Sequence, residues 1–153
     1  MQSVNQNVHA LSLFPLGSMK QSGNYQQHDY TQLGQEYLKL TERWSKNATY
    51  FTDKMPHNIN YAGVLLMALP NARLIHSRRH PMDVCLSVYK QNFESGQHYS
   101  YDLHELVQYY KFQEQIAEHW KSLFPDRVIS VDYEQVIAQT EEQTRKMLDF
   151  IIT

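Results

Sequence analysis

Short β-branched segments alternate with long helical segments along this chain, and this alternation constrains the fold more than any other feature of the sequence. Three segments have the Val, Ile, Thr or aromatic content of strands, at residues 49–52, 73–78 and 127–133. Five segments repeat apolar residues every three or four positions and are expected to be helices, at residues 30–46, 58–69, 81–93, 102–124 and 141–152. The connections between strands are long enough to hold helices, so the sheet should be mostly parallel. The sequence therefore predicts an α/β fold with three layers, in which helices flank a mostly parallel sheet.

Composition and charge exclude several classes of protein. The chain has 153 residues, 42% of them apolar and only five Gly and five Pro, which excludes collagen-like and disordered chains. Its net charge of -2 gives no overall positive field for nucleic acid or an anionic membrane. No run approaches the roughly 18 apolar residues of a membrane-spanning helix. We expect an irregular polar segment over residues 1–28, rich in Gln, Asn and Ser, followed by one domain over residues 29–153.

The single cysteine and the eight histidines indicate neither a disulfide nor a metal site. Cys85 has no partner in the chain, which fits a reducing compartment, and we expect a cytoplasmic protein. Its apolar helical neighbours predict a buried, inert thiol rather than a nucleophile. No His-Glu-x-x-His pattern and no Cys pair occurs, so no metal ligands are predicted.

The densest basic cluster lies at the end of the second predicted strand. Three of the six arginines fall within residues 73–80, and a helix that begins with Pro follows directly. Ligands of parallel sheets bind beyond the carboxyl ends of the strands. Arg79 in the turn and Ser87 within the helix have the donor groups that suit a phosphate. In the alternative interpretation, one arginine pairs with Asp83 or Asp53 and the others lie on the surface.

Two further sets of residues are candidates for chemistry. Lys54 follows the first predicted strand, where its ammonium group could stabilise charge on a leaving group; the alternative is a solvated loop lysine. Tyr99 and Tyr101 lie beside Gly96 and His98 in a break between helices. They could line a cleft for an acceptor substrate, or they could simply pack at the rim of the core.

Several segments, in order, resemble the sulfotransferases that are often joined to tetratricopeptide repeats. They are Phe-Thr-Asp-Lys-Met-Pro-His-Asn at 51–58, Pro-Asn-Ala-Arg-Leu-Ile-His at 70–76 and Arg-Arg-His-Pro-Met-Asp at 78–83. The similarity continues through residues 89–93, 98–103, 109–110 and 119–120 to Asp-Tyr-Glu at 132–134, and it covers about residues 29–153.

This resemblance implies the transfer of a sulfuryl group from 3'-phosphoadenosine 5'-phosphosulfate to an acceptor hydroxyl or amine. It also implies a fold like that of the P-loop nucleotide kinases and no required metal. Arg79 and Ser87 match the arginine and serine that hold the 3'-phosphate of the donor. Lys54 resembles the lysine that tyrosylprotein sulfotransferases place near the bridging oxygen, whereas cytosolic relatives have a base histidine in this neighbourhood. His98, Tyr99 and Tyr101 are the residues expected to contact the acceptor.

The chain also departs from the family pattern. It has no segment like Pro-Lys/Arg-Ser-Gly-Thr-Thr, the loop that binds the 5'-phosphosulfate at a helix N-terminus, and the C-terminal segment that contacts the nucleotide is missing. We therefore expect a fragment or truncated form with an incomplete core, which retains the 3'-phosphate site but has little or no activity.

The missing loop leaves other functions open. Loss of a central strand would expose pairing edges, so we expect a homo-oligomer formed by dimerisation or strand exchange. A non-catalytic, oligomerising interaction module derived from the sulfotransferase fold is the alternative function. A nucleotide kinase is disfavoured because no Gly-x-x-x-x-Gly-Lys-Ser/Thr loop occurs.

Overall fold

The computed structural model describes residues 26–45, 48–93 and 96–152, and the chain divides into two compact units after Ala72. Most of the predicted polar segment 1–28, namely residues 1–25, lies outside the described residues. In the first unit, α1 (Gln27–Ser45) precedes the 3-10 helix η3 (Pro56–Tyr61) and α2 (Ala62–Ala68). The predicted helix over 30–46 is thus confirmed. The helix predicted over 58–69 begins two residues earlier, as a 3-10 turn, because Pro56 takes the first helical position that proline favours.

The first unit is held together where α1 packs against α2. Leu33, Tyr37 and Ala68 are buried there, and partly buried apolar side chains surround them: Met55, Val64, Leu65 and Leu69. Gly34 lies where the two helices are in close contact, because a Cβ atom there would come within 2.0 Å of the Ala68 carbonyl oxygen. Only glycine therefore allows the two helices to approach this closely.

The predicted strand over residues 49–52 is wrong. Residues 48–55 form neither a helix nor a strand, and the side chains of Tyr50 and Phe51 are exposed. Aromatic and β-branched residues favour a strand through their packing against neighbouring strands. Among the described residues of the first unit there is no strand with which this segment could pair.

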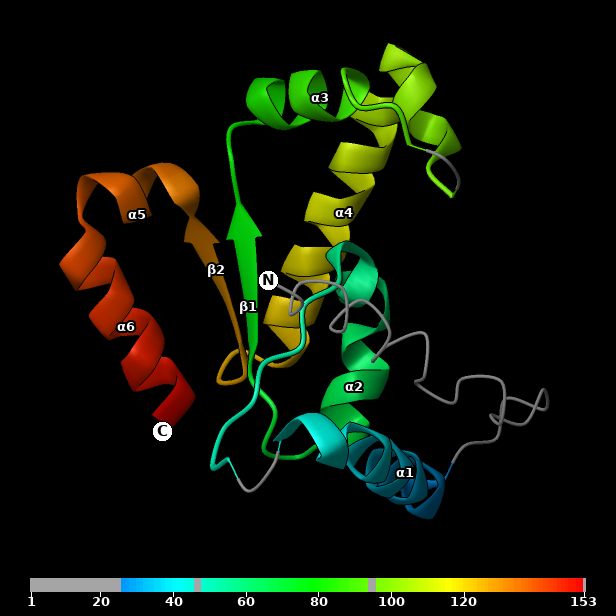
Figure 1. Cartoon of the computed structure of the whole chain (residues 1–153), viewed down its shortest axis with the longest axis vertical. Helices are drawn as coiled ribbons and strands as arrows, with labels where there is room; N and C mark the ends of the chain where they lie inside the picture. The colour runs from blue at the N-terminus through cyan, green and yellow to red at the C-terminus, as the bar shows by residue number, and fades with distance from the viewer. Residues whose placement is uncertain (1–25, 46–47, 94–95, 153) are drawn as a thin grey trace. The chain divides into compact units, whose positions relative to one another are not determined.

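The second unit contains a parallel pair of strands, each of which leads into a helix. Its elements are β1 (Leu74–Arg78), α3 (Pro81–Tyr89), the 3-10 helix η4 (His98–Tyr101), α4 (Leu103–Leu123), β2 (Val128–Asp132), α5 (Tyr133–Ala138) and α6 (Thr140–Ile152). The strands pair in register from Leu74 with Val128 to Arg78 with Asp132. Both strands run in the same direction, and α3 and α5 begin beyond their ends (Figure 1).

The long helix α4 is well capped and packs against the sheet. The Asp102 carboxylate accepts hydrogen bonds from the backbone N–H groups of His104 and Glu105, which satisfies two donors at the helix N-terminus. Leu106 and Ala117 are buried on the helix, and α4 contacts β2. This packing sets the position of the residues that follow the ends of the strands.

The described residues therefore combine helices with a small parallel sheet, as expected for an α/β protein. The predicted strands 73–78 and 127–133 and the predicted helices 102–124 and 141–152 are confirmed to within one or two residues at each end. The helix predicted over 81–93 ends at Tyr89. The short helix α5 was not predicted: its first residue was assigned to the preceding strand, and no element was assigned to the others.

Candidate functional site

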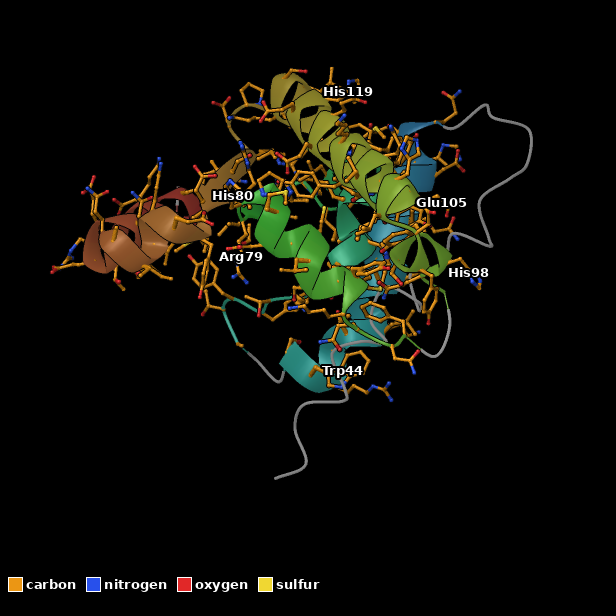
Figure 2. The ribbon with its side chains drawn as sticks, turned by 90° about the horizontal axis from the view of Figure 1, so that it is seen from above. Trp44, Arg79, His80, His98, Glu105 and His119 are labelled. Atoms are coloured by element: carbon orange, nitrogen blue, oxygen red, sulfur yellow. The ribbon has the colours of Figure 1, made fainter. Side chains whose placement is uncertain are left out.

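The turn between β1 and α3 carries Arg79, the residue predicted to bind a phosphate. Its guanidinium Nη2 lies 3.2 Å from Asp83 Oδ2, in the first turn of α3, and its Cζ lies 5.3 Å from the centroid of the Tyr133 ring. The side chains of Arg79 and Asp83 are 47% and 52% exposed, so this ion pair is open to solvent. Figure 2 shows Arg79 beside His80 at the start of α3. The pairing with Asp83 is the one that the alternative interpretation of the basic cluster expected.

The backbone of this turn is bonded to side chains from two other elements. The Tyr110 hydroxyl, on α4, donates to the Arg79 carbonyl oxygen at 3.2 Å. The His80 backbone N–H donates to Glu134 Oε1, on α5, at 2.9 Å. This hydrogen bond, the N–H of Glu134 itself and the charges of Arg79 and His80 lower the pKa of the Glu134 carboxyl.

The Arg78 guanidinium forms ion pairs with carboxylates on the face of the sheet that α4 covers. Its Nε lies 3.2 Å from Glu114 and 3.5 Å from Asp132, and its Nη1 lies 3.8 Å from Glu118. His76, two residues earlier on the same face of β1, lies 3.9 Å from Glu114. Burial lowers the pKa of His76 and outweighs the opposing effect of Glu114. Among the described residues, Arg78 thus has three carboxylate neighbours, whereas Arg79 has one ion pair, with Asp83.

Ser87 lies on the same side of α3 as Asp83. The two residues are four positions apart on the helix, which places them one turn apart on one face. Arg79 contacts Asp83, and the exposed Ser87 follows one turn further along. A forked guanidinium and a hydroxyl on one side of a helix have the hydrogen-bond donors that a phosphate requires. The shared role of Arg79 and Ser87 stays a prediction.

Lys54 belongs to the first unit, in the irregular segment before η3. Its side chain is exposed. The preceding residue, Asp53, accepts a 2.6 Å hydrogen bond from the Tyr37 hydroxyl on α1. Burial, together with the Asp53 carboxylate, raises the pKa of Tyr37 above its usual range. The segment that carries Lys54 is thereby tied to α1, and the catalytic role of this lysine stays a prediction.

The predicted acceptor residues all lie in η4, the 3-10 helix before α4. His98 is exposed and is seen there in Figure 2, away from Arg79. The ring of Tyr99 stacks on that of Tyr109 with centroids 3.8 Å apart, and burial together with Tyr109 raises the pKa of Tyr99 to about 12. The Tyr101 hydroxyl donates to the Phe93 carbonyl oxygen. Both tyrosines are thus fixed by local contacts, and acceptor binding by the three residues stays a prediction.

Three residues at the Arg79 turn were given no role from the sequence, although Tyr133 and Glu134 stood at the end of a predicted strand. Tyr110, Tyr133 and Glu134 contact Arg79 or His80 from positions 31 to 54 residues further along the chain. Tyr109-Tyr110 and Asp132-Tyr133-Glu134 were among the segments that resembled relatives, but they carried no role. For Tyr133 and Glu134 the available signal was their position at the end of a predicted strand. Tyr110 lies within α4 and had no such signal.

Cys85 has the environment expected of a structural thiol. It is buried on α3, and burial raises its pKa. Over residues 26–45, 48–93 and 96–152, no group of three or more His, Cys, Asp or Glu side chains is arranged to hold a metal ion. None of the helices in these ranges is both long enough and apolar enough to cross a bilayer.

The fold and the turn define an α/β protein with a candidate anion site at the end of a parallel strand. A family model described as the sulfotransferase family matches residues 9–152, and this chain therefore belongs to the sulfotransferase family. The chain is also similar to an uncharacterized protein of Aquifex aeolicus (strain VF5), with 34% identity over 120 residues. The match covers 76% of this chain but 16% of that protein, so the chain spans a small part of its relative. Comparison with solved structures found no match.

Proposed function

We propose that this chain binds the 3'-phosphate end of 3'-phosphoadenosine 5'-phosphosulfate, the sulfuryl donor, as part of a sulfotransferase. The acceptor would be a hydroxyl or an amine. The observation that carries the proposal is the placement of Arg79 just beyond the carboxyl end of β1, with its guanidinium half exposed and Ser87 on the adjoining face of α3.

The ion pair with Asp83 leaves Arg79 available to a phosphate. Ion pairs between solvent-exposed side chains contribute about 0.2–1 kcal/mol. A phosphate can form two parallel, charge-assisted hydrogen bonds with a guanidinium, and each such bond is stronger than a neutral one. A bound 3'-phosphate should therefore replace Asp83 at little cost, while the Ser87 hydroxyl donates one further hydrogen bond.

In the proposed reaction the acceptor oxygen or nitrogen attacks sulfur as the bond from sulfur to the bridging phosphate oxygen breaks. The acceptor's proton passes to solvent, and the electron pair of the broken bond leaves on adenosine 3',5'-bisphosphate. Arg79 would bind donor and transition state equally and so lower KM, because the 3'-phosphate does not react. Lys54 would stabilise the charge that develops on the bridging oxygen, which raises kcat. His98, Tyr99 and Tyr101 would bind the acceptor.

We expect residues 1–153 alone to show little turnover. No Pro-Lys/Arg-Ser-Gly-Thr-Thr segment occurs in this sequence, so the backbone cradle expected for the 5'-phosphosulfate has no counterpart among these residues. An assay with the donor and a phenolic acceptor tests this expectation, and robust product formation would contradict it.

Calorimetry with adenosine 3',5'-bisphosphate tests the proposed donor site. Arg79→Ala should weaken binding by about 30-fold to 150-fold, corresponding to the roughly 2–3 kcal/mol of charge-assisted hydrogen bonds. Arg145→Ala is the matched control, because Arg145 also pairs with a carboxylate four residues away, Glu141, on an exposed helix face. Adenosine 5'-monophosphate, which lacks the 3'-phosphate, should bind weakly and be insensitive to Arg79→Ala. No binding at millimolar ligand, or equal affinities for the two arginine variants, would refute the donor site.

A second candidate function is a non-catalytic module that forms homo-oligomers. The observation that favours it is the two-stranded sheet of the second unit, in which β1 and β2 each keep an outer edge without a strand partner among the described residues. Such edges offer free N–H and C=O groups to another chain. Light scattering over a concentration series tests this candidate: a mass that rises to that of a dimer supports it, and a monomer throughout opposes it.

A further inference from the structure

Both polar groups of a single peptide unit, the one that joins Arg79 to His80, are held by side chains from other elements. The carbonyl oxygen of Arg79 accepts from the Tyr110 hydroxyl at 3.2 Å. The N–H of His80 donates to Glu134 Oε1 at 2.9 Å. Tyr110 lies on α4 and Glu134 on α5, so two separate helices hold this one peptide.

Regular secondary structure provides no partner for these two groups. β1 ends at Arg78, so the peptide that follows Arg79 lies outside the strand. At the start of α3, the carbonyl oxygen of His80 accepts the helical hydrogen bonds from the N–H groups of Asp83 and Val84. A peptide unit is planar, and its C=O and N–H point in opposite directions. Holding both groups therefore stops the plane from rotating and sets the backbone angles on either side of it. One of these is the ψ angle of Arg79, which sets the direction of its side chain relative to α3.

The same two helices also hold the neighbouring side chains. Tyr133, the residue before Glu134, lies under the Arg79 guanidinium, with 5.3 Å from Cζ to the ring centroid. Glu114, one helical turn after Tyr110, forms the 3.2 Å ion pair with Arg78. The turn is thus held at its backbone and also at Arg78, the last residue of β1, which directly precedes it.

We propose that Tyr110 and Glu134 are positioning residues, which orient Arg79 toward the 3'-phosphate of the donor by holding the peptide that follows it. This inference rests on the proposed function, and it assigns to the two residues a role exerted through Arg79. Orientation before binding lowers the ordering cost of association, so loss of either hydrogen bond should weaken binding.

Glu134 allows the hydrogen bond to be separated from the charge. A carboxylate near a bound phosphate repels it, so removal of the charge alone should leave affinity unchanged or improve it. Glu134→Gln keeps an oxygen that accepts from the His80 N–H, whereas Glu134→Ala removes it. We expect Glu134→Gln to bind adenosine 3',5'-bisphosphate at least as tightly as wild type, and Glu134→Ala to bind about threefold to tenfold more weakly than Glu134→Gln.

Calorimetry on the full chain tests these expectations with matched controls. Tyr110→Phe should weaken binding by a similar factor, because it removes only the hydroxyl. Glu141→Ala and Tyr50→Phe make comparable changes at exposed positions outside the turn and should bind as wild type does. In an Arg79→Ala background, Glu134→Ala should have no further effect. Equal affinities for the Gln and Ala variants, or an undiminished effect without Arg79, would overturn the positioning role.

The amide signal of His80, followed by nuclear magnetic resonance without ligand, separates this inference from the proposed function. The chemical shift of this amide proton should follow the titration of Glu134, whose neighbouring charges are Arg79 and His80. Exchange of the amide proton with solvent should be faster in Glu134→Ala than in wild type, and unchanged in Glu134→Gln. If wild type binds the nucleotide and Arg79→Ala does not, but neither Glu134 variant changes binding or the His80 amide, the positioning proposal alone fails. If wild type does not bind the nucleotide, the proposed function fails and the positioning role fails with it.

Discussion

Replacement of Gly34 by alanine should weaken the packing of α1 on α2 in the first unit. The added methyl carbon would lie 2.0 Å from the Ala68 carbonyl oxygen and 2.9 Å from its carbonyl carbon, where ordinary contacts begin at 3.4 Å. Because both atoms belong to the backbone, no side-chain rotation relieves the overlap. The helices must separate locally by more than an ångström, and the buried contacts of Leu33 and Tyr37 loosen with them.

The expected free-energy change combines two opposing effects. Overpacking of a tight contact costs about 1–3 kcal/mol and sometimes more, and this overlap is at the severe end. Alanine gains about 1 kcal/mol over glycine in helix propensity. We expect a net loss of about 2 kcal/mol in the free energy of unfolding.

Urea unfolding followed by circular dichroism measures this loss, and Gly96→Ala is the comparison. Gly96 has a φ of +81° with no atom within 4 Å of the added carbon, so its substitution should cost about 1–2 kcal/mol from backbone strain alone. A Gly34→Ala protein as stable as wild type would refute the close approach of α1 to Ala68.

Four further predictions concern single side chains. Tyr37→Phe removes the 2.6 Å hydrogen bond to Asp53 and should lower the free energy of unfolding, measured by urea denaturation, by about 1–3 kcal/mol. An unchanged free energy would show that this hydrogen bond does not stabilise the fold. Leu106→Ala, at a site 2% exposed, should cost about 2–5 kcal/mol in the same assay, and a loss below 1 kcal/mol would contradict its burial. Alkylation of Cys85 should be slow at neutral pH and should accelerate in urea, because burial raises its thiol pKa; equal rates would refute this. The folded-state pKa of Glu134 is lowered, so its contribution to stability is present above the ordinary pKa of a glutamate and is lost as the pH falls through the lowered folded-state pKa. Glu134→Gln should flatten that part of the stability profile, and an identical profile would contradict the prediction.

The helices were predictable because each long one presents an apolar stripe to a neighbour. α1 buries Leu33 and Tyr37 and α4 buries Leu106 and Ala117, which are the positions that gave the sequence its helical period. The segment 49–52 has an equally clear local preference but no strand partner among the described residues. Local composition cannot supply a pairing partner, and this accounts for the wrong strand.

The candidate site was predictable only in its local part. A strand, a basic turn and a Pro-led helix follow one another within residues 73–89, so Arg79 and Ser87 could be proposed from the sequence. The partners of the turn come from elsewhere in the chain: Tyr110 is 31 positions after Arg79, and Glu134 is 54 positions after His80. Contacts at such separations depend on how the helices and strands pack, which periodicity does not specify.

The parallel register of β1 with β2 has a consequence for folding kinetics. The residues that pair between the two strands, from Leu74 with Val128 to Arg78 with Asp132, are always 54 positions apart. Closing so long a loop costs chain entropy before any of these pairs forms. Helix α4 needs only local contacts and should form early. Since Glu134 directly follows β2, an early intermediate rich in helix should lack the closed turn at Arg79, and nucleotide affinity should appear during refolding only with the slowest phase.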